Sequence, residues 1–210
     1  MKVLVIGASG RVGYQLVETL IEDGYKVVGT TRKKEKLFKD ANYEQINLDI
    51  TGPLDVIEKD IPENTDVIIF VSGSRGKDLL QVDLHGAVKT MQAAENKGIK
   101  RYVMLSALFS LQPDKWYTLI DYYTAKYFAD LYLMNQTKLD YTIVQPGYLA
   151  ETAGNGKIQV DESKLDIKGQ VSIRSVALTI KAVIKNKNTI GKRIPFLDGD
   201  TTIDEAVSQL

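Results

Sequence analysis

The chain of 210 residues carries 27 basic and 27 acidic side chains, so its formal net charge at neutral pH is zero. This balance gives no general attraction to nucleic acid or to an anionic membrane, and we expect neither as a partner. Cysteine is absent, which excludes disulfides, zinc–thiolate sites and a thiol nucleophile, and we expect no metal site. No apolar stretch approaches the length of a membrane span, so we expect a soluble, cytoplasmic protein.

The first thirteen residues carry the strongest motif in the sequence. Lys2–Ile6 is a short run of aliphatic and β-branched residues that predicts a buried strand. Gly7, Gly10 and Gly13 follow it at intervals of three residues, and a helical pattern then begins. In a dinucleotide site, these glycines would permit a sharp turn, a close approach of the backbone to a pyrophosphate, and close packing of the helix on the strand. The alternative is a glycine-rich turn that binds nothing.

Strands and helices alternate along the rest of the chain with short connections. The sequence predicts strands at residues 25–31, 43–47, 66–71, 101–105, 141–145 and 192–197. It predicts helices at residues 12–23, 33–38, 78–97, 115–138, 176–185 and 203–209, a short helix beginning at 51–53, and a loop with a short hairpin at 148–170. This alternation predicts an α/β Rossmann fold, a doubly wound parallel sheet in three α/β/α layers. No repeat or linker divides the chain, so we expect one domain over residues 1–210.

The residues that end the second predicted strand indicate which nucleotide binds. A carboxylate at this point binds the 2′-hydroxyl of NAD, whereas an arginine accommodates a 2′-phosphate. The chain has Thr31, Arg32 and Lys33 here and no carboxylate until Glu35. A guanidinium can grip a phosphate with two hydrogen bonds, so we expect NADP(H) to be preferred over NAD(H), with Arg32 as the main contact. The alternative is that Arg32 belongs to a solvated helix start.

Several segments, taken with the glycine turn, resemble one protein superfamily. They are GASGRVG after the first strand, LDI at 48–50, VDLHGAVKTMQAAENKGIKRYVMLSA at 82–107, YYTAKYFAD at 122–130 and LDYTIVQPGYL at 139–149. Together they resemble the short-chain dehydrogenase/reductase superfamily. More narrowly, the chain is similar to the atypical single-domain branch, which includes biliverdin/flavin reductase-like proteins and regulators of the nitrogen-metabolite-repression type. The resemblance is weakest across residues 107–121 and 148–170, which we expect to be the substrate-side loops.

This resemblance implies a set of cofactor contacts. The glycine turn would cradle the pyrophosphate, while further segments would border the adenine, the inner ribose and the nicotinamide. The residues are, in that order, Gly7, Ser9, Gly10, Arg11, Val12 and Gly13; Asp49 and Ile50; Val71, Ser72 and Gly73; and Pro146 and Gly147. They follow the carboxyl ends of predicted strands, where open α/β sheets bind ligands. For Asp49 the alternative is a plain turn carboxylate.

The catalytic signature of the superfamily is Tyr-x-x-x-Lys with an upstream serine, and Tyr122, Lys126 and Ser106 match it. A phenol can protonate the oxyanion that hydride transfer leaves on a carbonyl, and a cation one helical turn away favours the phenolate that remains. Lys126 could also contact a cofactor ribose, and Ser106 could hydrogen-bond the substrate oxygen. Because about one Tyr-x-x-x-Lys match is expected by chance among 11 tyrosines, the motif gains its weight from its place in a dinucleotide fold. In the atypical branch the tyrosine is often dispensed with.

Other polar and aromatic residues allow more than one interpretation. The aromatic and aliphatic side chains between the fifth strand and the next helix could line a pocket for a planar substrate, or form a buried cluster or a dimer contact. These residues are Phe109, Leu111, Trp116 and Tyr117. We expect His85, the single histidine, to be packed or solvated. Asp83 matches a polar position that the extended superfamily uses near its active site.

The sequence therefore predicts an NADP(H)-dependent oxidoreductase that transfers a hydride to a small carbonyl, quinone or flavin-like acceptor. The alternative is a non-catalytic NADP(H)-binding redox sensor that acts through a protein partner. A nucleotide-sugar epimerase or dehydratase ranks third, because the region after the sixth strand is short for a sugar-nucleotide site. The substrate is not evident from the sequence, and a monomer and a dimer are both open.

Overall fold

The computed structural model describes residues 1–210 and is built around a sheet of nine strands. The strands are β1 (Lys2–Ile6), β2 (Lys26–Thr30), β3 (Tyr43–Ile46), β4 (Val67–Phe70), β5 (Arg101–Leu105), β6 (Asp140–Pro146), β8 (Lys157–Gln159), β10 (Lys192–Asp198) and β11 (Thr201–Thr202). Their order across the sheet is β11-β8-β10-β6-β5-β4-β1-β2-β3. The pairs from β10 through β3 are parallel, and β8 runs antiparallel to β10 and β11. A separate parallel pair joins β7 (Tyr148–Ala150) to β9 (Gln170–Ser172).

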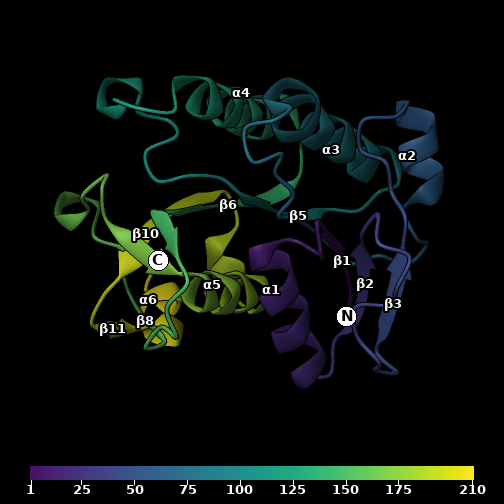
Figure 1. The fold of residues 1–210 in the computed structure, drawn as a ribbon, viewed down its shortest axis with the longest axis horizontal. Coiled ribbons are helices and arrows are strands. Elements are labelled where there is room, and N and C mark those ends of the chain that lie inside the picture. Colours follow the sequence, from purple (N-terminus) through teal and green to yellow (C-terminus); the bar gives the residue numbers. More distant parts are fainter.

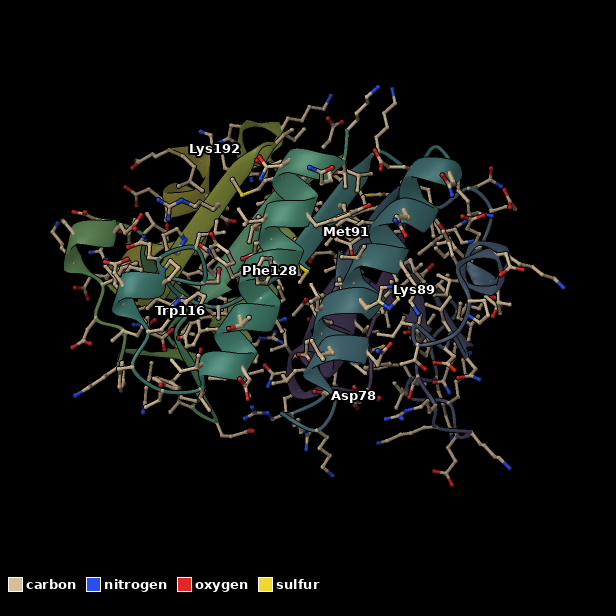
Figure 2. The ribbon with its side chains drawn as sticks, turned by 90° about the horizontal axis from the view of Figure 1, so that it is seen from above. Asp78, Lys89, Met91, Trp116, Phe128 and Lys192 are labelled. Carbon is tan, nitrogen blue, oxygen red and sulfur yellow. The ribbon has the colours of Figure 1, made fainter.

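Helices cover both faces of this sheet (Figure 1). The helices α1 (Arg11–Glu22), α5 (Ile173–Lys185) and α6 (Ile203–Ser208) lie on one face, and α2 (Leu54–Asp60), α3 (Ala87–Asn96) and α4 (Ile120–Gln136) lie on the other. Figure 2 looks onto the second face, where α3 and α4 run side by side, with Met91 on α3 and Phe128 on α4. Short 3₁₀ turns occur at Pro113–Lys115 (η2), Glu162–Lys164 (η3) and Lys187–Thr189 (η4). The predicted Rossmann fold of three α/β/α layers is confirmed.

Two hydrophobic cores lie on opposite sides of the sheet, because alternate side chains of a strand point to opposite faces. In β1, Val3 and Val5 join the core beneath α1 and α5, whereas Leu4 and Ile6 join the core beneath α2, α3 and α4. All four side chains are buried, which explains why this strand is apolar throughout. None of the helices has the length and the apolar composition needed to cross a membrane.

The prediction of a helix at residues 33–38 is wrong. These residues form an irregular loop after β2, and the side chain of Gln45 in β3 holds them in place. Its Nε2 donates to the carbonyl oxygens of Lys33 and Glu35 at 3.0 and 2.9 Å, and its Oε1 accepts the N–H of Leu37 at 2.9 Å. One amide side chain thus supplies the hydrogen bonds that a helical turn would otherwise provide.

Other element boundaries differ from the prediction for local reasons. The helix predicted at 78–97 begins as a π-helix, η1 (Leu79–Gly86), and continues as α3. The helix α4 begins only at Ile120, after the turn at Pro113–Lys115. The helix α5 begins at Ile173, three residues before the predicted start, because Ser172 Oγ accepts the N–H of Ser175 at 3.0 Å and caps it. The hairpin predicted at 148–170 is wrong, since β7 and β8 pair with β9 and β10 instead.

Candidate active site

The register of the parallel strands brings the predicted site residues together at the carboxyl ends of the strands. Ile6 pairs with Phe70, Phe70 pairs with Met104, and Leu105 pairs with Val144. The segments that follow β1, β4, β5 and β6 therefore emerge side by side at the carboxyl ends of these strands. The glycine turn, the segment Val71 to Gly73 and Ser106 follow their strands there. The strand β6 ends there at Pro146, and Gly147 follows it.

The glycine turn after β1 is packed too closely for side chains. Gly7 has a φ of +98°, and a Cβ there would lie 2.8 Å from the backbone of Ser72. A Cβ at Gly13 would collide with the carbonyl oxygen of Gly7. The N–H of Gly7 donates to Thr30 Oγ1 at 3.1 Å, which fastens the turn to β2. No side chain caps α1 after Gly10 and its first turn holds no acidic residue, so this helix start fits the pyrophosphate of a dinucleotide.

The residues expected at the adenosine end lie after β2 and β3. Arg32 and Asp49 are both exposed. Thr51 donates its hydroxyl and its N–H to Asp49 Oδ1 at 2.6 and 2.9 Å, and these bonds hold the pKa of Asp49 below its usual value. The positive charges of Lys89 and Arg32 act in the same direction. Asp49 is thus a turn carboxylate that also lies within the field of Arg32, while Ile50 is buried.

Ser106 lies directly after β5 and is only 3% exposed. Its Oγ donates to Asp130 Oδ2 in α4 at 2.6 Å. Ser110 Oγ donates to the same oxygen at 2.6 Å and accepts from Gln145 Nε2 at 2.6 Å. The hydroxyl hydrogen expected to reach a substrate oxygen is therefore turned toward a buried carboxylate in this structure.

Tyr122 and Lys126 lie one turn apart on α4, as the motif predicts. Lys126 Nζ is buried, donates to the carbonyl oxygen of Leu105 at 3.0 Å and lies 5.8 Å from the centre of the Tyr122 ring. Burial lowers the pKa of Lys126, while the charges of Asp83 and Asp130 oppose that shift. Burial also raises the pKa of Tyr122, and Asp83 adds to it. The phenol is therefore protonated at neutral pH and holds a proton that it can donate.

Asp83 connects the segment after β4 with the Tyr122 and Lys126 pair. It lies in the π-helix η1, is 1% exposed, and its Oδ2 accepts the N–H of Ser74 at 2.9 Å. A π-helix is uncommon and is frequently found at functional sites. His85, in the same element, is exposed, as expected for a solvated histidine.

The two expected substrate-side loops contact each other. Gln112 donates to Glu162, and the hydroxyls of Thr118 and Tyr148 lie 3.5 Å apart. Of the aromatic residues in these loops, Phe109 is buried with Leu108 and Leu197. Trp116, labelled in Figure 2, donates Nε1 to the Phe109 carbonyl at 2.9 Å and stacks on Tyr123 at 5.5 Å. The buried-cluster interpretation therefore describes Phe109, which the half-buried Trp116 contacts through its hydrogen bond. Leu111 is also half-buried, and Tyr117 is exposed.

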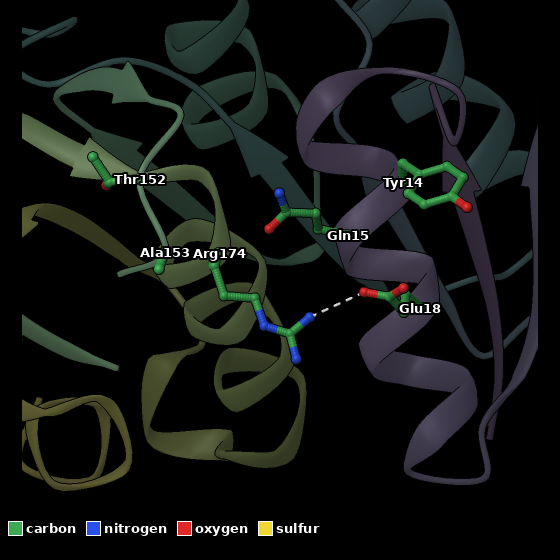
Figure 3. Close-up of a pocket in the computed structure, with 6 residues that line it drawn as sticks. All are labelled: Tyr14, Gln15, Glu18, Thr152, Ala153 and Arg174. Atoms are coloured by element: carbon green, nitrogen blue, oxygen red, sulfur yellow. Dashed lines mark hydrogen bonds and ion pairs between the residues drawn. The ribbon is translucent and has the colours of Figure 1, made fainter. Parts of the chain in front are cut away.

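An open hollow of about 450 Å³ lies between α1, α5 and the segment after β7 (Figure 3). Its lining residues are Tyr14, Gln15, Glu18, Thr152, Ala153 and Arg174. Arg174 spans it to form an ion pair with Glu18 at 3.2 Å, and the amide of Gln15 points toward it. None of the predicted catalytic residues lines this hollow.

Sequence reasoning missed three residues of the buried network: Ser110, Asp130 and Gln145. Asp130 lies four residues after Lys126, which itself lies four residues after Tyr122. Helical periodicity places all three on one face, so this spacing was an available signal. Ser110 and Gln145 gave no signal of their own, since their contact depends on the tertiary packing of the β5–α4 connection against β6.

Comparison with known proteins agrees with this geometry. The model of the NAD(P)H-binding family matches residues 7–187. A Bacillus subtilis protein named "Uncharacterized sugar epimerase YhfK" is 35% identical, with 100% of both chains covered. The crystal structure of the oxidoreductase ylbE from Lactococcus lactis has a TM-score of 0.94 and 43% identity, and covers 100% of this chain and 96% of that one. A putative NAD-dependent epimerase/dehydratase from Bacillus halodurans has a TM-score of 0.90 and 32% identity, with 100% of both chains covered.

The glycine turn and the cluster of Ser106, Tyr122 and Lys126 thus occur in a chain whose relatives are described as oxidoreductases and epimerases. The edge of the sheet carries the features that a pyridine dinucleotide requires, and the family model begins at the first glycine of the turn. The chain belongs to the NAD(P)H-binding family.

Proposed function

We propose that the protein is an NADP(H)-dependent oxidoreductase that transfers a hydride to a small carbonyl, quinone or flavin-like acceptor. The observation that carries the proposal is the position of Ser106, Tyr122 and Lys126. They lie at the carboxyl end of β5, along the same sheet edge as the glycine turn. Hydride transfer needs a proton donor beside the cofactor site, and in this proposal Tyr122 is that donor.

In this proposal, the bound nicotinamide supplies the hydride, and the chain supplies position and protons. Tyr122 donates its phenolic proton to the oxygen of the reduced acceptor. Lys126, whose ammonium faces the ring at 5.8 Å, stabilises the phenolate left behind. Lys126 is 3% exposed and Tyr122 is half-buried, so both charges act where access of water is restricted.

The activity is tested by NADPH consumption with a panel of quinones, flavins and aldehydes. With an acceptor in hand, Tyr122→Phe should lower kcat by about 10²- to 10⁴-fold, the usual contribution of a proton donor. Unchanged turnover in Tyr122→Phe would remove the tyrosine from the mechanism. Tight binding of both NADP⁺ and NADPH with no turnover would favour the redox sensor.

The preference for NADP(H) is a separate part of the proposal and depends on Arg32. This side chain is exposed after β2, where it is free to meet a 2′-phosphate. We expect Arg32→Ala to raise the Kd for NADPH by about 10- to 100-fold, because charge-assisted hydrogen bonds are lost, and to leave the Kd for NADH unchanged. Lys34→Ala, at a neighbouring exposed position, is the matched control and should change neither constant. Equal affinity of the wild type for NADPH and NADH would contradict the preference.

A nucleotide-sugar epimerase is the second candidate, because two full-length relatives carry epimerase descriptions. The Tyr-x-x-x-Lys pair would suit that chemistry as well. The region from β7 to β9 is short for a sugar-nucleotide site, however, and contacts the loop before α4 through Gln112–Glu162 and Thr118–Tyr148. Interconversion of nucleotide sugars without net consumption of the cofactor would favour this candidate over the reductase.

A further inference from the structure

Asp130 is a fully buried carboxyl group directly behind the proposed catalytic residues. It has 0% exposure and lies on α4 one turn beyond Lys126 and two turns beyond Tyr122. Nothing in the proposed hydride transfer uses it. A buried ionisable group costs free energy unless its environment compensates it, so its contacts require an explanation.

The hydrogen bonds of Asp130 are unevenly distributed between its two oxygens. Oδ2 accepts the hydroxyls of Ser106 and Ser110, each at 2.6 Å. Oδ1 is buried and has no partner, and neither has the buried Oε1 of Gln145. Lys126 donates to the Leu105 carbonyl and forms no ion pair with Asp130. The polar groups around this carboxyl are thus Ser106, Ser110, Gln145 and Lys126. Only Lys126 is a cation, and it donates to the Leu105 carbonyl instead.

This arrangement determines what Ser106 can offer to a substrate. A hydroxyl has a single hydrogen, and that of Ser106 points to Asp130 Oδ2. A substrate oxygen beside Ser106 would then meet only lone pairs, which cannot stabilise an oxyanion. Hydrogen bonds to an ionised carboxylate are roughly twice as strong as bonds between neutral groups. A neutral Asp130 would therefore hold the hydrogen of Ser106 much less firmly.

We propose that Asp130 is a positioning residue: its charge sets whether Ser106 turns its hydroxyl hydrogen inward or offers it to the acceptor oxygen. The proposal rests on the proposed reductase function. An ionised Asp130 keeps the hydrogen inward. A neutral Asp130 releases it to the developing oxyanion.

The charged groups around Asp130 come from two elements. Lys126 and Tyr122 share α4 with it, and Asp83 of η1 acts on both of these groups. The strands β5 and β6 and the connection after β5 contribute only uncharged partners to the carboxyl. Burial raises the pKa of Asp130 to about 6, against the opposing effects of the two serine hydroxyls and of Lys126. The change of charge thus falls between about pH 5 and pH 7.

The first test follows the carboxyl itself by ¹³C NMR of the side-chain carboxyls in the full chain, with and without NADPH. Asp130→Asn identifies the resonance, which should titrate near pH 6. Ser106→Ala and Ser110→Ala should each shift this midpoint to higher pH, because each removes a donor that stabilises the carboxylate. A midpoint near the ordinary aspartate value, or one that Ser106→Ala leaves unchanged, would overturn the proposal.

The second test uses the pH profile of kcat/KM with the acceptor found by NADPH consumption. The kcat/KM of the wild type should fall with rising pH around a midpoint near 6, toward the level of Ser106→Ala. The fall should be about 10²- to 10³-fold, the loss expected for one oxyanion donor. Asp130→Asn should stay near the acid plateau throughout, with the Kd for NADPH within about twofold of the wild type. Ser110→Ala is the matched control, since Ser110 contacts the same oxygen of Asp130 but is 0% exposed and so out of reach of an acceptor. It should move the midpoint upward and leave the acid plateau unchanged.

The two tests separate this proposal from the proposed function. If no acceptor is reduced, the reductase fails, and the NMR shift caused by Ser106→Ala still decides whether Asp130 holds the hydrogen of Ser106. If an acceptor is reduced but Asp130→Asn keeps the pH profile of the wild type, the positioning role is overturned and the reductase stands.

Discussion

Asp130 makes the stability of the fold depend on pH in a direction opposite to that of a salt-bridged aspartate. Its pKa is about 6 in the folded chain against an ordinary value of 3.8, so the folded state binds the proton more tightly than the unfolded state does. The resulting stabilisation is fully present below about pH 4 and is lost as the pH rises through 6. At roughly 1.4 kcal/mol for each pKa unit, the loss is about 3 kcal/mol.

This prediction is measured as the free energy of unfolding in urea between pH 4 and pH 7.5. The wild type should lose about 2.5 kcal/mol over this range relative to Asp130→Asn, because the asparagine does not ionise. Other titrating groups contribute equally to both proteins and cancel in the difference. Parallel pH curves for the two proteins would show that Asp130 is ionised throughout.

At the scale of elements, the junction of the glycine turn with α1 separates a folding requirement from a binding requirement. A Cβ at Gly13 would collide with Gly7 and lie 3.0 Å from Ala8 Cα, both fixed backbone atoms. At Gly10, a Cβ would approach nothing nearer than the Gly7 oxygen at 3.2 Å. The two glycines therefore differ in packing, and we expect them to have different roles although they share one motif.

We expect Gly13→Ala to lower the free energy of unfolding by about 3 kcal/mol, the upper part of the usual cost of overpacking. Gly10→Ala should cost less than about 1 kcal/mol and should weaken NADPH binding by at least about tenfold, because its methyl group stands where the pyrophosphate approaches. Thermal unfolding and fluorescence titration with NADPH measure both effects. Equal stability losses in the two variants would contradict this division.

The elements that the sequence predicted are those with strong local signals. The strands Lys2–Ile6 and β4 could be predicted because each is an apolar run. The glycine turn could be predicted from the spacing of its glycines. The loop after β2 could not be predicted, because its hydrogen bonds come from Gln45 in another strand. The same holds for Asp130: its position on α4 follows from periodicity, whereas its contacts with Ser106 and Ser110 require the packed sheet.

At the scale of the whole molecule, Arg101 joins parts of the fold at the amino ends of the strands, opposite the site at their carboxyl ends. Its guanidinium donates to the Asp140 carbonyl at 2.7 Å, to Thr142 Oγ1 at 2.8 Å, to Thr189 Oγ1 at 3.1 Å and to the Val183 carbonyl at 3.2 Å. Burial lowers the pKa of Arg101 to about 10, so it stays charged at neutral pH. This one side chain links β5, β6, α5 and η4.

Arg101→Lys should therefore lower the free energy of unfolding by about 3 kcal/mol, because an ammonium cannot reproduce the planar set of donors and leaves buried acceptors without partners. The Kd for NADPH should stay within about twofold, since Arg101 is the first residue of β5, whereas Ser106 follows the opposite end of this strand. Lys100→Ala, at the exposed neighbouring position, is the control and should leave stability within about 0.5 kcal/mol. A large change in the Kd of Arg101→Lys would indicate that packing at the amino ends of the strands affects nucleotide binding at their carboxyl ends.

The Gln45 amide has a consequence for the thermodynamics of cofactor choice. It rigidifies residues 33–37, and Lys33 N–H further donates to Thr31 Oγ1 at 3.1 Å, so Arg32 stands between two anchored neighbours. The conformational entropy of this loop is lost during folding, and little remains to be lost when a nucleotide arrives. In the proposed function, discrimination by Arg32 therefore depends on preorganisation by Gln45, which lies in the edge strand β3. Cofactor selectivity could therefore drift through exchange of Gln45 alone, with every nucleotide-contacting residue unchanged.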